Sequence, residues 1–344
     1  MQPNHLEQLT QAVQHAVAQT DFSGVLSIKV DGAIVFEQAY GFADRSHRVR
    51  NTLKTRFGLA SGAKFLTALG IGRLIDAGRV SLSTHLAKCV NIDLPYLSQA
   101  VTLGQLLTHT SGVYDYLDEE VVSDIDQLVL PVPCYQLRRL TDYLPLLRQG
   151  PMKFPPGERF SYSNSGYILL GLVIEALSGQ AYADFIQREI LDRCGMSDSG
   201  YFPMDQLPER TATGYIDNRE GWRSNIYHLP IVGGSDGGGY ATVGDIHKLW
   251  EAFFADRIIS RELRHTFLAP AVSAASQGAY DFYGHGIWMH HEPDSIPAYY
   301  IVGNDPGVSF ISKWTHAGER MVTGISNTTH GAWPVRRAIE PFLW

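Results

Sequence analysis

The N-terminal part of the chain changes from a helical to a strand-like pattern of apolar positions. From His5 to Ala18, apolar side chains recur every three or four residues, which predicts an amphipathic helix. Two runs rich in β-forming residues follow, at about 23–30 and 33–41. They flank Asp31-Gly32, a dipeptide suited to a type I′ hairpin turn. This part of the chain therefore predicts a helix followed by two antiparallel strands.

Helical patterns dominate the middle of the chain. The segment from Tyr167 to Leu177 is apolar on nearly all sides, which predicts a buried helix, and Gly179 follows it as a stop signal. Thr102 and Gln105 have the spacing of a capping box at the start of a short helix. The predicted helices cover residues 61–77, 103–108, 167–177, 181–193 and 242–254.

Strand patterns return near the C-terminus, at 283–290, 298–302, 308–315 and 319–326, with a turn at Ala317-Gly318 and a final helix at about 332–343. Strands thus lie at both ends of the chain and helices between them. The simplest packing is an α+β fold in which both chain ends form one antiparallel sheet, flanked by helices, with a large all-helical region inserted. We expect a sheet domain from 1–80 and 270–344, and a mainly helical domain from 81–269.

Composition narrows the classes of function. The chain has 28 Lys and Arg against 35 Asp and Glu, a net charge of −7, and no basic run, which argues against nucleic-acid binding. No stretch of about 18 apolar residues predicts a membrane-spanning helix. The N-terminus lacks the pattern of a signal peptide, so we expect a cytoplasmic protein, or a periplasmic one if a leader has been removed. Three widely spaced cysteines, Cys89, Cys134 and Cys194, favour free thiols, and nothing points to a metal or another cofactor.

Ser61 and Lys64 stand three residues apart at the start of a predicted helix, so their side chains project from one face. A serine hydroxyl is a weak nucleophile until a base takes its proton, and a lysine one turn away can do so when its amine is neutral. Burial and the positive end of the helix both disfavour the ammonium form. The same helix N-terminus offers a backbone N–H to a developing oxyanion. The plain alternative is that Ser61 caps the helix.

Tyr162 and Asn164 form a second candidate pair, just before the buried helix. In an extended segment, residues two apart point to the same side. A tyrosine can relay protons, and an asparagine amide can hold a substrate carbonyl together with the lysine. The ordinary alternative is that Ser163, Asn164 or Ser165 caps the helix while Tyr162 packs against it.

Four segments in order carry a resemblance to a known family: S-x-x-K at 61–64, L-L-T-H-T-S-G at 106–112, P-P-G-x-x-F-x-Y-S-N at 155–164 and G-G-G-Y-A-T-V-G-D at 237–245. Together they resemble the serine β-lactamase and penicillin-binding-protein superfamily. More narrowly, they are similar to the class C β-lactamase-like group, which also holds D-aminopeptidases, DD-peptidases and family VIII-type esterases. The resemblance covers nearly the whole chain, and the β-lactamase/transpeptidase-like fold it implies agrees with the pattern above.

The resemblance implies a role for each matching residue. Ser61 would be the acylated nucleophile, and Lys64 with Tyr162 the general base of acylation. Tyr162 would then protonate the leaving group and activate water for deacylation, while Asn164 would bind substrate. His109, in the second segment, would be a structural marker beside the site.

The third motif of the family, K-T-G or H-x-G before a Pro-Gly turn, aligns with Ile301-Val302-Gly303. Gly303 is retained, and the N–H of Asn304 would be the second oxyanion donor, but the cation is missing. That cation binds a substrate carboxylate through a charge-assisted contact, which isoleucine cannot make. We therefore expect neutral esters or amides to be preferred over penicillins. A cation from His285, His290 or His291, near the neighbouring strand, is the alternative.

These observations predict a serine hydrolase that forms an acyl-serine on ester or amide bonds, with a small-molecule ester, amide or β-lactam substrate. One alternative is a β-lactamase or a D-Ala or D-amino-acid peptidase proper. Another is a penicillin-binding sensor that is acylated without turnover. A remote third is an α/β-hydrolase using Ser235, since residues 233–237 match G-x-S-x-G. Against it, Gly238-Gly239 stand where a helix must follow, and the ordinary interpretation is a glycine-rich loop lining a cleft.

Overall fold

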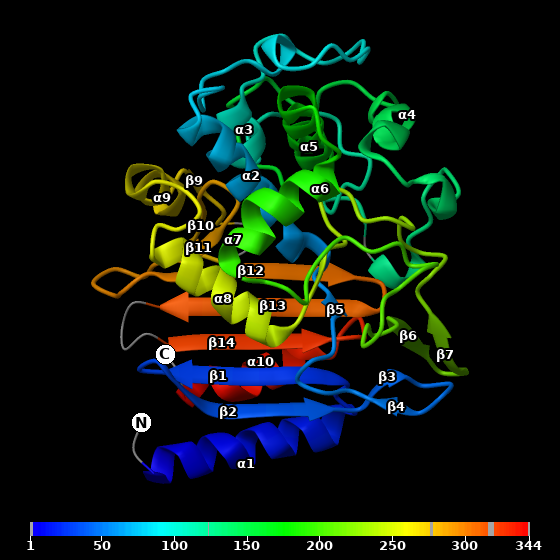
Figure 1. Ribbon diagram of the computed structural model, residues 1–344, viewed down its shortest axis with the longest axis vertical. Coiled ribbons are helices and arrows are strands. Elements are labelled where there is room, and N and C mark those ends of the chain that lie inside the picture. The colour runs from blue at the N-terminus through cyan, green and yellow to red at the C-terminus, as the bar shows by residue number, and fades with distance from the viewer. Residues whose placement is uncertain (1–2, 123, 276–277, 316–319, 343–344) are drawn as a thin grey trace.

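One antiparallel sheet forms the centre of the fold. The computed structural model describes residues 3–122, 124–275, 278–315 and 320–342. Within these residues the sheet has eight strands in the order β2-β1-β14-β13-β12-β11-β10-β9. The N-terminal strand β1 (Gly24–Val30) pairs with the C-terminal strand β14 (Arg320–Ser326), so both chain ends build the sheet, as the sequence predicts (Figure 1). The predicted turn at Ala317-Gly318 lies outside the described residues.

The predicted N-terminal hairpin is present in the structure, with small shifts of its ends. Asp31 and Gly32 both have positive φ, as a type I′ turn requires, between β1 and β2 (Ala33–Tyr40). The remaining strands of the sheet are β9 (Val272–Ser273), β10 (Asp281–Tyr283), β11 (Trp288–His290), β12 (Ala298–Asp305) and β13 (Val308–Thr315).

The prediction of one strand at 283–290 is wrong, because the chain reverses within it. β10 and β11 pair antiparallel, and Gly286 between them has a φ of +86°. A Cβ on Gly286 would lie 2.2 Å from the Cβ of Ala68, so the turn packs directly against the helix of the proposed nucleophile segment. Only glycine combines that backbone conformation with that close approach.

Helices cover both faces of the sheet. On one face, α1 (Pro3–Thr20) and α10 (Ala332–Ile339) pack against β1, where Leu9, Val13 and Val335 form a small apolar core with it. On the other face lies α8 (Val243–Phe254), whose Trp250 donates a 2.8 Å hydrogen bond to Ser312 of β13. Figure 1 shows α8 in front of the sheet and α10 behind it.

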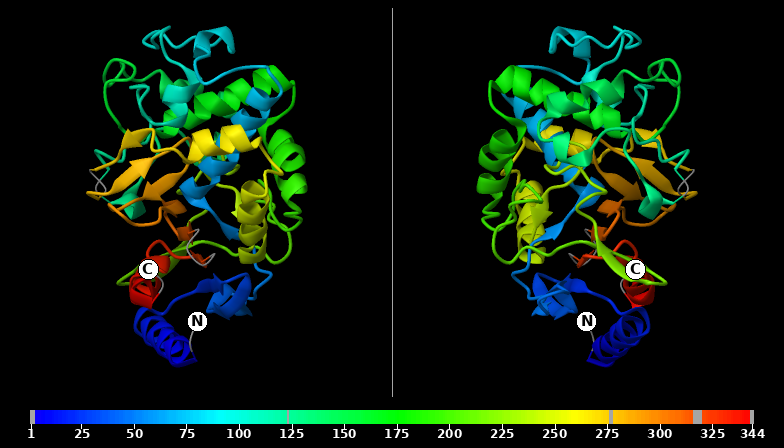
Figure 2. Two further views of the ribbon diagram at one scale, coloured as in Figure 1. Left: turned by 90° about the vertical axis from the view of Figure 1, so that its left-hand side faces the viewer. Right: turned by 90° about the vertical axis from the view of Figure 1, so that its right-hand side faces the viewer.

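The remaining helices gather at the end of the molecule away from α1 (Figure 2). At their centre lie α2 (Lys64–Asp76) and α5 (Asn164–Ser178), which bury most of their side chains in the main core. Thr102 forms the predicted capping box of α3, and Thr242 caps α8. The others are α3 (Leu103–Leu107), α4 (Leu144–Leu147), α6 (Tyr182–Ile186), a π-helical stretch (Gln187–Leu191), α7 (Asp192–Cys194) and α9 (Arg261–Leu268).

No single helix in the described ranges is long and apolar enough to cross a membrane. Only α5 together with the segment Tyr182–Cys194 reaches that length and composition, and the two are bent by 79°.

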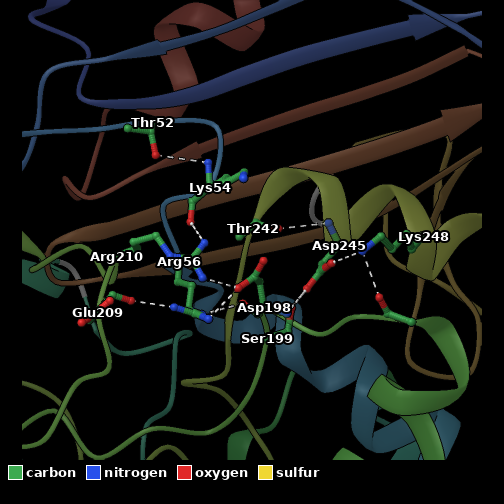
Figure 3. Close-up of polar contacts among 11 residues, drawn as sticks. Thr52, Lys54, Arg56, Asp198, Ser199, Glu209, Arg210, Thr242, Asp245 and Lys248 are labelled. Atoms are coloured by element: carbon green, nitrogen blue, oxygen red, sulfur yellow. Dashed lines mark hydrogen bonds and ion pairs between the residues drawn. The ribbon is translucent and has the colours of Figure 1, made fainter.

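Three small two-stranded sheets complete the fold: β3 (Phe42–Asp44) with β4 (Val49–Arg50), β5 (Phe57–Gly58) with β8 (Tyr240–Ala241), and β6 (Tyr215–Asn218) with β7 (Gly221–Ser224). A polar network fixes the position of the segment just before β5 (Figure 3). Arg56 and Arg210 both donate to the carboxylate of Asp198, at 2.6 and 2.7 Å. The backbone N–H of Asp198 in turn donates to Asp245 of α8. The segment that leads into Ser61 is therefore fastened to α8.

Candidate active site

Ser61 lies on a short 3-10 turn, Ala60–Ala63, between β5 and α2. It is partly exposed, lines a pocket, and is not the helix cap, because no side chain caps either the turn or α2. Ala60 just before it has a φ of +46°, an uncommon conformation for alanine. Strained backbone of this kind concentrates at functional sites, and here it orients the turn that presents the Ser61 hydroxyl.

Lys64 is only 2% exposed, yet its ammonium nitrogen has three partners. Its Nζ lies 2.9 Å from Ser61 Oγ, 2.7 Å from Asn164 Oδ1 and 2.6 Å from the backbone oxygen of Asp236. Burial lowers the pKa of Lys64, and nearby carboxylates, Asp236 first among them, partly oppose that effect. The structure thus brings three of the predicted residues into one hydrogen-bonded cluster, with a lysine that loses its proton more easily than usual.

Tyr162 completes the cluster from the other side. Its hydroxyl is hydrogen-bonded to Ser61, and its ring centroid lies 4.8 Å from Lys64 Nζ. Burial raises the pKa of Tyr162 well above its usual value, and Glu119 adds to the effect. The phenol therefore keeps its proton under conditions in which Lys64 can be neutral, so the two groups are fitted for different steps of proton transfer.

His109 and Asp115 fix the segment that carries Tyr162 and Asn164. The N–H of Ser163 donates to His109 Nδ1 at 3.0 Å, and the N–H groups of Asn164 and Ser165 donate to the Asp115 carboxylate at 3.1 and 2.8 Å. His109 is fully buried against the Tyr162 ring, and burial holds its pKa well below the usual range. It is thus a neutral acceptor and a positioning residue, as the sequence suggests. Ser163 is the true N-cap of α5, which begins at Asn164 and not at the predicted Tyr167.

Gly303 packs against the nucleophile turn. A Cβ on this residue would lie 2.2 Å from the Leu59 oxygen and 2.8 Å from the Ser61 nitrogen, so no other residue fits. Asp305 and Val308 form the pair that closes the two-residue turn between β12 and β13. The next pair, Asn304 with Ser309, is therefore not hydrogen-bonded between these two strands. The N–H of Asn304 thus points away from β13, toward the edge of β12 that faces β11. The described pairs between β11 and β12 extend only as far as Tyr300, so they do not include Asn304. The roles of Gly303 and Asn304 beside the oxyanion stay predictions from the alignment.

None of the three histidines considered as replacement cations lines the pocket. His285 is partly buried and stacks on Phe267, and burial lowers its pKa to about 4. His290 is paired with Asp281 at 2.8 Å. Ile301 itself is 2% exposed and belongs to the main core. In the described residues, the pocket lining includes no lysine or arginine, so the missing cation is not supplied by another strand.

The pocket in front of Ser61 is walled by apolar side chains and by the glycine-rich loop. Leu128, Leu130, Met204 and Leu229 form much of its apolar surface, while the carboxylates of Asp236 and Asp305 contribute negative charge. The loop 233–239 therefore lines a cleft, as its ordinary interpretation holds.

Ser235, the serine of the G-x-S-x-G match, is fully buried and donates to the Tyr167 carbonyl oxygen at 2.8 Å. It faces α5 so closely that a Cβ on Gly171 would lie 2.2 Å from its hydroxyl oxygen. The antiparallel sheet also lacks the strand-to-helix turn of a nucleophile elbow. The α/β-hydrolase alternative is therefore wrong.

Sequence reasoning did not single out the acids around the cluster. Asp115, Glu119, Asp236 and Asp305 all act on the charge of Lys64. Burial raises the pKa of Asp115 and of Asp305 to about 7. Asp115, Glu119 and Asp236 lie outside the four motifs, and Asp305 ends β12 beside the Pro-Gly turn, so only the Asp236 position inside a glycine-rich run gave any signal.

The family model of the beta-lactamases matches residues 9–325 of the chain. The chain belongs to the beta-lactamase family. Among solved structures, the penicillin-binding protein from Bacillus halodurans is similar over 96% of this chain and all of that one, with 42% identity and a TM-score of 0.90. The "Putative penicillin-binding protein PbpX" of Bacillus subtilis is 25% identical over 94% of this chain and 75% of its own length.

A less similar protein shares the fold. The D-amino acid amidase from Ochrobactrum anthropi superposes with a TM-score of 0.77 over 97% of both chains, at 22% identity. The family assignment and the α+β fold predicted from the sequence are thus confirmed. EstCE1, described as a hydrolase with promiscuous acyltransferase activity, shares the fold as well, at 18% identity and with a TM-score of 0.80.

Proposed function

We propose that this protein is a serine hydrolase that cleaves ester or amide bonds of small substrates through an acyl-Ser61 intermediate. The observation that carries the proposal is the 2.9 Å contact between Lys64 Nζ and Ser61 Oγ, made by a buried lysine whose pKa is lowered. A lysine amine at this distance can take the proton of a serine hydroxyl in those enzyme molecules in which the amine is neutral.

In acylation, neutral Lys64 takes the proton of Ser61 as Oγ attacks the substrate carbonyl carbon. The N–H groups of Ser61 and Asn304 receive the negative charge that develops on the carbonyl oxygen. When the tetrahedral intermediate collapses, Tyr162 gives its proton to the departing oxygen or nitrogen and regains one from Lys64. The bond to the leaving group breaks, and the acyl group remains on Ser61.

In deacylation the same groups act on water. Lys64, with Tyr162 as relay, takes a proton from a water molecule that attacks the acyl carbon. The ester bond to Ser61 breaks, Oγ recovers a proton, and the carboxylic acid leaves. Asn164, which accepts from Lys64 and donates to the Leu117 carbonyl oxygen, orients the lysine throughout.

The charge of the pocket supports a preference against carboxylate-bearing substrates. Ile301 stands where the family has a cation, and the described pocket lining contains the acids Asp236 and Asp305 but no lysine or arginine. A penicillin or a peptide C-terminus therefore meets repulsion instead of a charge-assisted contact. Neutral esters and the amides of amino acids avoid this penalty.

A hydrolysis panel tests the proposal: p-nitrophenyl esters, D-amino-acid amides and a chromogenic cephalosporin, each with the wild type and Ser61→Ala. We expect Ser61-dependent turnover, with higher kcat/KM on a short aryl ester than on the cephalosporin. The reverse order would overturn the substrate preference. Unchanged activity in Ser61→Ala would overturn the mechanism, and a stable acyl-enzyme without turnover would identify a penicillin-binding sensor instead.

A further inference from the structure

The pocket beside Ser61 contains a carboxylate without a partner. Asp305 lines the pocket and is only partly exposed, and its carboxylate accepts no hydrogen bond within the described residues. The other pocket carboxylate, that of Asp236, accepts a hydrogen bond from the Tyr116 hydroxyl at 2.5 Å. A carboxylate held partly out of water without a counter-ion is costly, so it marks a place where a ligand can supply the missing charge.

The position of Asp305 relates it to the reacting atoms. It follows Gly303 by two residues on β12, so both face the same side of the sheet. Gly303 packs against the Ser61 nitrogen on that side. Two residues of strand span roughly 7 Å, and Asp305 and Ser61 line the same pocket. An ammonium bound about 3 Å from the Asp305 carboxylate can therefore belong to the substrate whose carbonyl Ser61 attacks.

The charges facing Asp305 leave it without a dedicated cation. Lys64 lowers its pKa, whereas burial, Asp236 and Glu119 raise it, with a net value of about 7. Lys64 is already held by Ser61, Asn164 and the Asp236 backbone. His228 also lines the pocket, but burial lowers its pKa, so it is neutral at pH 7 and adds no positive charge.

We propose that Asp305 binds the ammonium group of the substrate, and that the substrates are esters or amides of amino acids with a free amine and an apolar side chain. The ammonium would form an ion pair with Asp305, and the apolar side chain would contact the wall of Leu128, Leu130 and Met204. This inference rests on the proposed acyl-Ser61 chemistry and names the substrate class of the same site.

The test uses matched pairs of substrates that differ in one charge: phenylalanine p-nitroanilide with a free amine and its N-acetyl derivative, in both enantiomers, at neutral pH. For the preferred enantiomer we expect wild-type kcat/KM to favour the free amine by about tenfold or more, which is the worth of one partly buried ion pair. In Asp305→Asn the ratio between the two substrates should fall by about tenfold, and in Asp305→Glu it should be partly retained.

Asp31→Asn is the matched control. It removes the same charge at the hairpin turn of β1 and β2, at the opposite end of the sheet from Asp305, and asparagine tolerates its positive φ. The ratio should stay at the wild-type value. Thermal unfolding of each variant checks that it is folded.

The outcomes separate this inference from the proposed function. If Ser61→Ala keeps the wild-type rate, the proposed function fails. If activity depends on Ser61 but the free amine gives no advantage, or if the ratio is the same in Asp305→Asn, the role of Asp305 is refuted. A preference for the N-acetyl substrate would refute it as well.

Discussion

Two serines stand in glycine-containing segments that lie side by side, and only one of them faces the pocket. Ser61 is partly exposed on a short turn next to Lys64, whereas Ser235 is fully buried with its hydroxyl on a backbone carbonyl. The two segments touch, since a Cβ on Gly237 would lie 3.3 Å from the Ala60 backbone. Whether a serine in such a segment can act as a nucleophile therefore depends on its exposure to solvent and on a base beside it.

The loop of Ser235 nevertheless supports the site through its backbone. The carbonyl oxygen of Asp236 accepts from Lys64 at 2.6 Å, and that of Ser235 accepts from Thr67 at 2.5 Å. The Leu59 N–H donates to the Gly239 oxygen at 2.8 Å. The glycines allow this loop to lie against the turn of Ser61, so one segment supplies the reactive groups and the other holds them.

The largest difference should appear when the hydroxyls of Ser61 and Ser235 are removed in two separate variants. Ser61→Ala should lower kcat on an aryl ester by about 10⁴-fold or more, because the acyl-enzyme cannot form. Ser235→Ala should keep kcat within about tenfold and lower the free energy of unfolding by about 1 kcal/mol, the net value of one buried hydrogen bond. Steady-state kinetics and urea unfolding measure both. A large loss of kcat in a folded Ser235→Ala variant would erase the contrast between the segments.

A smaller effect should appear in the pH profile when the loop loses a charge. Lys64 must be neutral to act as base, so kcat/KM should fall as pH falls through its lowered pKa. The Asp236 carboxylate raises the pKa of Lys64. Asp236→Asn should therefore move this acidic limb to lower pH.

The profile of kcat/KM against pH for the wild type and Asp236→Asn measures the shift. Asp217→Asn, at an exposed position on β6, serves as the control and should leave the limb in place. A shift to higher pH in Asp236→Asn would contradict the assignment of Lys64 as the base.

The last effect should be one on stability, and it should follow when α2 and the loop lose the hydrogen bond from Thr67. Thr67 is fully buried, and its hydroxyl lies 2.5 Å from the Ser235 oxygen and 2.6 Å from the Tyr182 hydroxyl. Thr67→Val keeps the shape but leaves buried polar groups unsatisfied, which costs about 1–3 kcal/mol. Urea unfolding measures the loss, and a Thr67→Ser variant, which keeps the hydroxyl, should recover part of it. Equal stability of Thr67→Val and wild type would mean that the contact does not hold the loop.

Local patterns were enough to predict most elements and the central cluster. The Asp31-Gly32 turn, the Thr102 capping box and the Thr242 cap depend on neighbours a few residues away, so their signals are contained in the sequence. One exception is the reversal at Gly286, where the turn packs against Ala68, a contact that no window of sequence contains.

The sequence by itself determined the family, the order of the elements and the residue types that meet at Ser61, because motifs and periodicity are properties of neighbouring positions. Tertiary structure alone decided which serine faces the pocket and which acids surround Lys64. Solvent access and pKa depend on groups brought together from distant segments, such as Asp115, Asp236 and Asp305. Low dielectric and short distance give these groups their effect, and both exist only in the folded chain.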